Sequence, residues 1–352
     1  MSAFNTTLTK AVNIAALSMP KFAVIILNWN GEALLTRYLP SVVTYSGEAT
    51  VYLADNASTD GSVAFVKRHY PSVRIIENKV NGGFAKGYND ALKQVDADVY
   101  CLLNSDVEVS ENWLEPVWKL MSEHPEAAIV QPKILDLLNK DRFEYAGAAG
   151  GFLDRLGYPF CRGRIFQALE EERGQYNDVT EIFWATGACM FVRADVFWEL
   201  KGFDEGYFAH QEEIDFCWRA QNRGYKVFYT GYSAIYHLGG STLSNMNPKK
   251  TFLNFRNSLY SITKNLPGKR FFLVILIRLL LDFVAALRFL LLGKWRHSLA
   301  VLKAHLSYYR NFYSMYAKRK NATFTRNYYI TTSIVWSHFV HQVSNFNDLI
   351  KD

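Results

Sequence analysis

The first hundred residues of the chain alternate between short apolar runs and amphipathic segments. Each apolar run has the length of a strand, and each amphipathic segment has the length of a helix. The predicted strands are residues 22–27, 50–54, 73–76 and 99–103, and the predicted helices are 32–43, 61–69 and 85–95. Strands and helices that alternate in this way build a parallel sheet covered on both faces. The pattern therefore predicts an α/β fold.

Each predicted strand ends in polar, turn-forming residues. These ends are Asn-Trp-Asn-Gly at 28–31, Asp-Asn-Ala-Ser at 55–58, Glu-Asn at 77–78 and Asn-Ser-Asp at 104–106. In an open α/β sheet, ligands bind in the crevice at the carboxyl ends of the strands. We therefore expect these polar ends to converge on one site.

After residue 106 the alternation loosens. The stretch 147–174 is rich in Gly, Arg and aromatic residues, which is typical of a substrate-contacting loop region. Two further helices are predicted at about 193–201 and 211–223, and strands follow at 225–229 and 234–237.

The segment 271–293 is apolar except for Arg278, Asp282 and Arg288. At 100° per residue these charges lie within an arc of about 120°, so one face of the helix is charged. Three central charges, at about 2.5 to 3.5 kcal/mol each, nearly cancel the gain that the apolar residues of a membrane-spanning helix would provide. We therefore expect a helix that lies in the membrane interface with its basic face toward anionic lipid. A membrane-spanning helix and a buried core helix are the alternatives.

Charge is distributed unevenly along the chain, whose formal net charge is +6. Residues 266–345 contain twelve Lys and Arg against one acid, Asp282, which places +11 in this tail and leaves −5 for the rest. A basic, aromatic-rich tail indicates an anionic partner, and its apolar run favours lipid over nucleic acid. We expect a disordered N-terminal extension at 1–20, an α/β domain at 21–267, and a basic, helical, membrane-associating region at 268–352.

Asp106 and Asp55 are candidate binding residues at the predicted strand ends. A carboxylate such as Asp106 can hold Mg²⁺ or Mn²⁺, which take oxygen ligands and bridge phosphates, although acids at strand ends also cap turns. Asp55 is either a turn residue or an acceptor for the base or ribose of a nucleotide. The segment 81–89, Asn-Gly-Gly-Phe-Ala-Lys-Gly-Tyr-Asn, matches neither G-x-G-x-x-G nor the P-loop pattern, so neither a dinucleotide fold nor a P-loop is supported.

Taken together, the ordered motifs resemble those of family 2 glycosyltransferases of the GT-A fold. They resemble in particular the rhamnosyltransferase-like branch that builds bacterial surface polysaccharide. The resemblance covers about residues 22–267 and implies a GT-A domain with a mainly parallel sheet. It is carried by residues 28–31, 55–62, 81–89 and 104–106, and further by Trp-Ala-Thr-Gly-Ala at 184–188, Gly-Phe-Asp-Glu at 202–205, Glu-Glu-Ile-Asp-Phe-Cys-Trp-Arg at 212–219 and Tyr-His at 236–237.

The resemblance implies a metal site and a donor site. Asp106 corresponds to the last acid of the family's Asp-x-Asp metal motif, and Asn104 stands in place of the first acid. His237 matches a position that completes the coordination of the metal in relatives, whereas a lone His is otherwise structural. The implied cofactor is Mg²⁺ or Mn²⁺. The implied donor-binding residues are Asn28, Asn30, Asp55, Asn81, Lys86, Asn89, Asn104 and Asp106.

The resemblance also implies a general base. The family's Glu-Asp pair, whose second acid is the base, corresponds to Glu212 and Glu213. Glu in place of the usual Asp moves the carboxylate by about one methylene. Asp215 is the alternative base, and a solvated acidic helix face is the structural alternative. Candidates for phosphate or acceptor contacts, or else for surface salt bridges, are Arg162, Arg164 and Arg256.

The implied activity is an inverting transfer of a sugar, with rhamnose one candidate, from a UDP- or dTDP-sugar to a lipid-linked or polysaccharide acceptor in cell-surface glycan synthesis. We expect a peripheral protein at the cytoplasmic face of the bacterial inner membrane that contacts an anionic membrane surface and no nucleic acid. Two alternatives stay open. One is a nucleotidyltransferase that forms sugar nucleotides, and the other is a non-catalytic, membrane-bound sugar-nucleotide binding protein.

Overall fold

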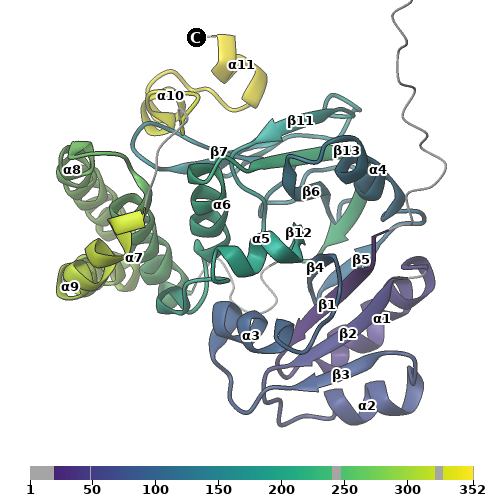
Figure 1. Cartoon of the computed structure of the whole chain (residues 1–352). Coiled ribbons are helices and arrows are strands. Elements are labelled where there is room, and N and C mark those ends of the chain that lie inside the picture. Colours follow the sequence, from purple (N-terminus) through teal and green to yellow (C-terminus); the bar gives the residue numbers. More distant parts are fainter. Residues whose placement is uncertain (1–19, 48, 240–246, 322–327, 352) are drawn as a thin grey trace, which may run out of the picture.

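The computed structural model describes residues 20–47, 49–239, 247–321 and 328–351 (Figure 1). The N-terminal extension expected at 1–20 lies outside these residues except for its last position. The described chain forms a central sheet with helices on both faces, a small second sheet, and a group of C-terminal helices at one side of the molecule (Figure 1).

The first half of the central sheet is the parallel arrangement that the sequence predicts. Strands β4, β1, β2 and β3 lie side by side in this order and run parallel. Each predicted element of this half is present, with small shifts at its ends. The strands are β1 (Phe22–Asn28), β2 (Thr50–Asp55), β3 (Arg74–Glu77) and β4 (Val99–Asn104), and the helices are α1 (Glu32–Tyr45), α2 (Ser62–His69) and α3 (Gly83–Leu92).

Strand β1 shows why these strands read as continuous apolar runs. Phe22, Val24 and Ile26 pack into the core on the face that α1, α2 and α4 (Glu115–Glu123) cover. Ala23 and Ile25 pack into the core on the opposite face, with residues of α3, α5 (Ala194–Glu199) and α6 (Glu212–Asn222). Because helices cover both faces, a polar residue inside the strand would be buried on either side. The first polar residue of β1 is therefore its last, at the carboxyl edge.

The second half of the sheet departs from the simple alternation. Strand β12 runs antiparallel between β4 and β6, and β13 pairs parallel with β6. The two strands expected at 225–229 and 234–237 are one strand, β13, whose register against β6 shifts between Thr230 and Ala234. Within this irregularity a Cβ at Gly231 would lie 2.1 Å from Tyr176 O, so only glycine fits. The strands are β5 (Val107–Val109), β6 (Ala127–Asp136), β11 (Val179–Ile182), β12 (Cys189–Arg193) and β13 (Lys226–His237).

The Gly- and aromatic-rich stretch 147–174 contains a small antiparallel sheet. Its strands follow the order β10-β9-β8-β7. They are β7 (Gly151–Leu153), β8 (Pro159–Cys161), β9 (Arg164–Ile165) and β10 (Ala168–Leu169). Strands of two or three residues are too short for an alternating pattern to show in the sequence.

The C-terminal helices pack on the α/β body and on one another. Helix α7 contacts α6, α8 and α9. The elements are α7 (Pro248–Asn265), α8 (Arg270–Leu291), α9 (Trp295–Ala317), the short 3-10 helix η3 (Lys318–Asn321), α10 (Ile334–Phe339) and α11 (Phe346–Lys351); a further 3-10 turn, η2 (Glu205–Tyr207), precedes α6. Within the described residues, no helix combines the length and the apolar character that crossing a membrane requires.

Helix α8 forms where the sequence predicts a helix, but the expected orientation of its charged face is wrong. Arg278 is 2% exposed and Asp282 is fully buried. Arg278 Nε lies 3.4 Å from Asp282 Oδ1, and Asp282 also accepts from Tyr158 OH at 2.9 Å and lies 3.1 Å from His305 Nε2. These groups pair with one another inside the protein, and they could not do so if this side of α8 lay against lipid. The two charges therefore face the protein, and of the three only Arg288 lies on the exposed side.

Candidate active site

The carboxyl ends of β1 and β2 bring three of the predicted donor-binding residues together. Asn28 and Asp55 are partners in the strand register, and the Asn28 amide donates to Asp55 Oδ1 over 3.0 Å. The backbone N–H of Asn30 donates to Ser58 Oγ over 2.8 Å. Asn28 Oδ1 is buried and has no hydrogen-bond partner among the described residues. The hydrogen bonds of this cluster stabilise the turns after β1 and β2 and leave Asn28 Oδ1 as an unsatisfied acceptor at the edge of the sheet.

Asn81 shapes the turn that leads into α3. Its Oδ1 accepts from the Gly83 N–H at 3.0 Å and from the Asn56 amide at 3.1 Å. Gly83 has a φ of +79°, and a Cβ there would lie 2.4 Å from Phe208 O. The glycine therefore allows the start of α3 to approach the loop that precedes α6.

Lys86 and Asn89 lie on α3 and already have protein partners. Lys86 Nζ lies 2.6 Å from the Asp90 carboxylate, one turn further along the helix. The Asn89 amide donates to Phe203 O at 2.9 Å and accepts from Phe203 N at 2.9 Å. Asn89 therefore joins α3 to the segment before η2, which is a structural role, and donor contacts from either residue stay predictions.

The predicted metal ligands, Asp106 and His237, are neighbours. Strand β13 ends at His237 and pairs with β5, which begins directly after Asp106. Asp106 Oδ1 consequently lies 3.2 Å from His237 Nε2. Glu144 Oε2 lies 3.3 Å from His237 Nδ1, and the Asn104 amide nitrogen lies 3.4 Å from His237 Nε2. Asp106, Glu144 and His237 are all buried.

The charge balance of this cluster fits a bound cation. Burial by itself lowers the pKa of His237, but Asp106 and Glu144 raise it to about 10, so the imidazole carries a proton between two carboxylates. A divalent cation bound at Asp106 and His237 would replace this proton and bring one further positive charge to the two carboxylates, and a carboxylate oxygen is a ligand that Mg²⁺ and Mn²⁺ prefer. Among the described residues no group of three or more His, Cys, Asp and Glu is arranged to hold a metal ion. The residues that would hold a cation here are Asp106 and His237.

Glu213 lies in the first turn of α6, directly after a loop with unusual backbone conformation. Phe208, His210 and Gln211 have φ values of 67°, 68° and 72°. Non-glycine residues rarely adopt this region, and the strain of holding them there is typical of functional sites. Asn257 of α7 holds the loop, because its side-chain amide nitrogen lies 2.7 to 3.1 Å from three carbonyl oxygens in residues 207–210 and shares its two hydrogens among them.

The acid pair at the start of α6 is perturbed by burial. Burial raises the pKa of Glu213 to about 7. Burial and the adjacent Glu213 raise the pKa of Glu212 well above its usual range. Glu213 Oε2 has no hydrogen-bond partner in the part of the chain that the structure describes. A carboxyl group that ionises near neutral pH and has an unsatisfied oxygen is suited to accept a proton from a substrate.

Backbone contacts tie the loop before α6 to the strand ends. The Phe84 N–H at the start of α3 donates to Phe208 O over 2.8 Å. Gly187 faces the Phe84 ring closely enough that a Cβ would lie 2.8 Å from it. The next residue, Ala188, accepts from the Asn104 N–H at 3.0 Å. The acid pair and the carboxyl edge of the sheet therefore belong to one connected region.

Asp215, the alternative base, is enclosed in a network of protein donors. Its carboxylate lies 2.8 Å from Lys264 Nζ and 2.9 Å from Arg219 Nε, and it accepts from the Asn265 amide at 2.8 Å. The side chain is fully buried. Burial alone would raise the pKa of Asp215, but the two cations hold it below its usual range. This arrangement favours a structural role for Asp215 over proton abstraction.

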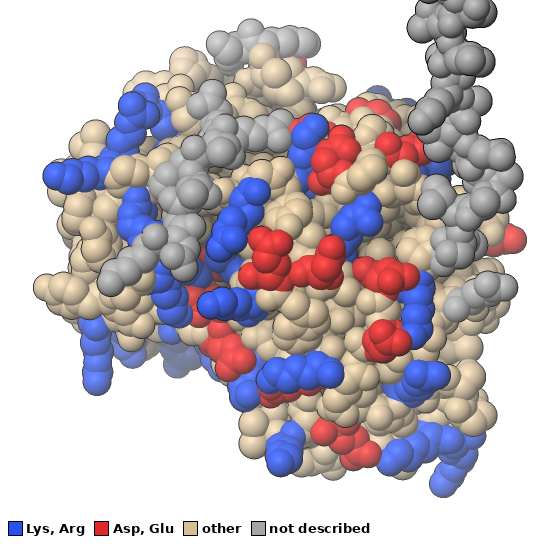
Figure 2. All heavy atoms as spheres, in the orientation of Figure 1, with Lys and Arg blue, Asp and Glu red and all other residues tan. Residues whose placement is uncertain are grey.

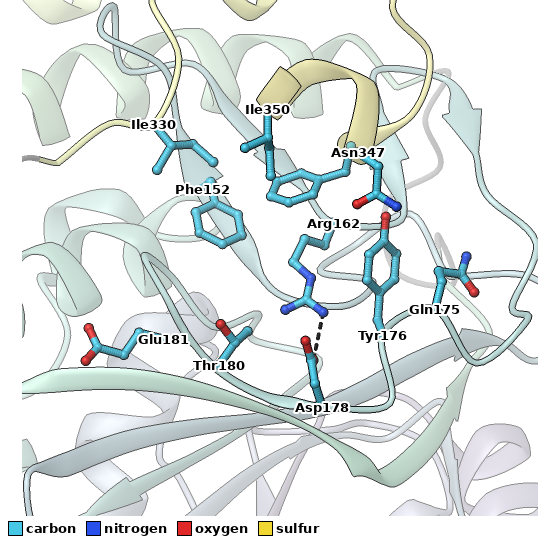
Figure 3. A pocket seen from close by; sticks show the side chains of 11 residues that line it. Phe152, Arg162, Gln175, Tyr176, Asp178, Thr180, Glu181, Ile330, Asn347 and Ile350 are labelled. Atoms are coloured by element: carbon cyan, nitrogen blue, oxygen red, sulfur yellow. Dashed lines mark hydrogen bonds and ion pairs between the residues drawn. The ribbon is translucent and has the colours of Figure 1, made fainter. Parts of the chain in front are cut away.

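The three predicted arginines lie in different places. Arg162 pairs with Asp178 at 2.7 Å inside a cavity of about 360 Å³ beside β11, the edge strand farthest from β3 (Figure 3). Arg164 is buried and donates to the Phe166 carbonyl at 3.1 Å. Of the three, Arg256 alone lies beside the loop before α6, where it donates to Tyr207 O at 3.1 Å. Phosphate or acceptor contacts from these residues stay predictions.

Glu144 and Asn257 belong to the site although sequence reasoning did not find them. Glu144 follows β6 in the stretch where the strand pattern loosens. Asn257 is a fully buried polar residue in the middle of α7. A polar residue on the apolar side of a helix is a weak signal that its side chain has a specific partner. Neither residue lies in a motif, so only the folded chain shows their role.

The fold and the site define a glycosyltransferase. The sequence model of Glycosyl transferase family 2 matches residues 23–201, about half of the chain, and the chain belongs to this family. The N-acetylglucosaminyl-diphospho-decaprenol L-rhamnosyltransferase of Mycobacterium tuberculosis is 28% identical over 222 residues, which cover 58% of this chain and 71% of that protein. A low-salt glycan biosynthesis hexosyltransferase of Haloferax volcanii is 22% identical over 58% of this chain and 63% of its own length.

Solved structures show the same fold. A structure of GalNAc-T7 with UDP, GalNAc and Mn²⁺ has a TM-score of 0.54 and 16% identity, over 70% of this chain and 48% of that chain. This chain thus spans about half the length of GalNAc-T7. A Pyrobaculum calidifontis mannosyltransferase with GDP-Man and Mn²⁺ has a TM-score of 0.51 and 15% identity, over 86% of this chain and 85% of that chain. The predicted family and the predicted GT-A class are confirmed. A glycosyltransferase is neither of the two alternatives that the sequence left open, the nucleotidyltransferase and the non-catalytic binding protein.

Proposed function

We propose that the protein is an inverting glycosyltransferase. It moves a sugar, with rhamnose one candidate, from a UDP- or dTDP-sugar to a lipid-linked or polysaccharide acceptor in cell-surface glycan synthesis. The observation that carries this proposal is the arrangement around Glu213. A carboxyl with a pKa of about 7 and a buried, unpartnered oxygen stands in the first turn of α6, directly after a strained loop that is tied to the strand ends. The name of the mycobacterial relative, which specifies a decaprenol-linked acceptor, supports a lipid-linked substrate.

In the proposed reaction Glu213 removes the proton from the acceptor hydroxyl. The hydroxyl oxygen forms a bond to the anomeric carbon from the face opposite the nucleotide, and the bond from that carbon to the diphosphate breaks. Asn28 and Asp55 at the sheet edge bind the nucleotide. Asp106 and His237 hold Mg²⁺ or Mn²⁺, which when bound offsets the negative charge of the departing diphosphate.

Release of the nucleotide is the direct test of this proposal. The purified protein is incubated with UDP-, dTDP- and GDP-sugars, with and without Mn²⁺ or Mg²⁺, and free nucleotide diphosphate is measured with and without a polyprenyl-diphosphate-linked sugar. We expect release from at least one donor that accelerates when the acceptor is added. If all donors stay intact under all of these conditions, the proposed function is wrong.

Asp106→Ala should raise the metal concentration that gives half-maximal activity by about tenfold or more, because a directly bound carboxylate is lost while the donor-binding cluster remains. A titration of activity against Mn²⁺ measures this shift. Glu108→Gln is the matched control, since this acid of β5 pairs with Lys140 on the surface. An Asp106→Ala enzyme with an unchanged Mn²⁺ requirement would exclude Asp106 as a ligand.

The dependence of kcat/KM on pH should follow the ionisation of Glu213. The base acts only when its carboxyl is deprotonated, and burial raises its pKa to about 7. Activity should therefore be at its plateau above pH 7 and fall by about tenfold for each pH unit below it. Measurements between about pH 5 and pH 9 with saturating metal check this profile. A profile that stays flat down to pH 5 would show that Glu213 does not act as the base.

A further inference from the structure

The surface of α8 that faces away from the protein is apolar along the whole helix. Its exposed large apolar residues are 38% to 79% exposed, and they are Phe272, Leu273, Leu276, Leu279, Leu280, Phe283, Val284, Leu287, Leu290 and Leu291. At 100° per residue they lie within an arc of about 140° centred opposite Arg278. Scattered single apolar residues are normal on a protein surface, but a contiguous face of this length indicates an interaction site.

The buried charges of α8 determine which side faces outward. Besides its contact with Asp282, Arg278 donates to Ser258 Oγ of α7 at 3.0 Å and lies over the Tyr158 ring at 3.8 Å. Asp282 is joined to His305 of α9 at 3.1 Å. Rotating α8 to bury its leucines would take this ion pair into solvent or lipid and leave its partners on α7 and α9 unpaired. The outward direction of the apolar face is therefore enforced by specific contacts.

Helix α9 continues this surface with an apolar stripe beside a basic stripe. The apolar stripe consists of exposed residues at helical spacing, namely Leu299, Leu302, Leu306, Tyr309, Tyr313 and Tyr316. The basic stripe consists of Arg296, Lys303 and Arg310, spaced seven residues apart. All three are exposed, and none forms an ion pair with a described residue. At the edge of the molecule that α8 and α9 form, Lys and Arg stand out from an otherwise uncharged surface, whereas acidic side chains gather over the α/β body (Figure 2).

We propose that this surface, formed by the exposed apolar faces of α8 and α9 together with the basic stripe of α9, docks on an anionic lipid bilayer. The apolar side chains enter the boundary between headgroups and acyl chains, and the basic stripe contacts anionic headgroups. Aromatic side chains such as Tyr313 and Trp295 suit the same boundary. Docking through the exposed apolar face of α8 is the reverse of the orientation expected from the sequence, in which the charged face contacts lipid.

A second copy of the chain fits this surface less well than lipid does. Two copies that met face to face would bring two basic stripes into one interface. The described residues of α8 and α9 contain one acid, Asp282, and it is buried. Such an interface would have no exposed acid to balance the charge, whereas an anionic bilayer provides it. The proposal deepens the proposed function, because docking would present a lipid-linked acceptor to the enzyme, but its test does not depend on sugar transfer.

Sedimentation with vesicles tests the docking surface directly. The full chain and the triple variant Leu276→Glu/Leu280→Glu/Phe283→Glu are mixed with vesicles of phosphatidylcholine alone or with one quarter phosphatidylglycerol. The double variant Leu138→Glu/Tyr232→Glu is the matched control, since these apolar residues are 68% and 65% exposed on the α/β body. Circular dichroism confirms that each variant is folded.

We expect the wild-type chain and the control to bind anionic vesicles, and the triple variant to bind at least tenfold more weakly. Arg296→Gln/Lys303→Gln/Arg310→Gln should lose the preference for anionic over neutral vesicles while it retains binding to neutral ones. Equal sedimentation of the wild-type chain and the triple variant would overturn the proposal. The proposal would also be overturned if the wild-type chain formed a dimer that does not bind vesicles and the triple variant were monomeric. That result would assign the surface to self-association. If the wild-type chain releases no nucleotide from any donor, the proposed function fails, but the result of the vesicle experiment is unaffected.

Discussion

Glu213→Gln should lower kcat by about 10²-fold to 10⁴-fold, the range that a general base contributes. Gln retains the size of the side chain and cannot accept the proton. The substitution should leave the free energy of unfolding unchanged or slightly higher, because it replaces a carboxyl whose pKa burial raises to about 7 with a neutral amide. Steady-state kinetics with saturating donor and metal, together with urea unfolding, measure the two effects.

Glu199→Gln is the control for this experiment. Glu199 ends α5 on the surface, where its Oε1 lies 3.4 Å from Arg223 Nη1. Its replacement removes one negative charge from the same domain and should leave kcat at the wild-type value. A Glu213→Gln enzyme that retains more than a tenth of the wild-type kcat would show that another group takes the proton.

Asp215→Asn should mainly destabilise the fold, by about 3–5 kcal/mol, because it breaks a buried ion-pair network and leaves cations without their partner. Lys264 is 4% exposed and would keep only Asp204, at 2.6 Å, as a carboxylate partner. The pKa of Asp215 is lowered in the folded protein. Its stabilising effect is therefore fully present above the unfolded pKa of about 4 and is lost as the pH falls further. Urea unfolding at pH 7 measures the loss of stability in Asp215→Asn. At low pH the same experiment should show a smaller difference between the variant and the wild type.

The exposed acid Asp96, which pairs with Lys21 on the surface, serves as the comparison, and Asp96→Asn should not change the unfolding midpoint. The Glu213→Gln and Asp215→Asn substitutions distinguish the two candidate bases by whether turnover or stability is lost. Glu213→Gln should affect turnover without affecting stability, and Asp215→Asn should affect stability first. An Asp215→Asn protein of wild-type stability that has lost turnover would reverse the assignment.

The sequence predicted the parallel half of the sheet well because each strand there is buried on both faces. A strand such as β1 must be apolar throughout, and its first polar residue, Asn28, marks the end of the strand. The polar ends of β1, β2 and β4 could therefore be located in advance, and they meet as expected. Strands β6 and β12 were not predicted. Strand β12 runs antiparallel between β4 and β6, and an antiparallel strand inserted between parallel ones has no local signal that sets its neighbours.

The residues around the metal and base sites were only partly predictable. Asp106 and His237 lie in recognisable motifs, and their proximity follows from the pairing of β5 with β13. Glu144 and Asn257 act through contacts between elements distant in the chain, which no spacing reveals. The choice between Glu213 and Asp215 also depended on packing, because two acids in one helical turn look alike until their partners are known.

The sequence by itself determined the family, the α/β order and the presence of a basic, apolar C-terminal region, since these depend on composition, periodicity and motif order. It also indicated correctly that Arg278 and Asp282 share one side of α8. Only the tertiary structure decided which side faces the protein, because Arg278 and Asp282 find partners on α7, on α9 and at Tyr158. A helical pattern specifies which residues share a face. The direction of that face is set by the partners that other segments of the chain bring to it.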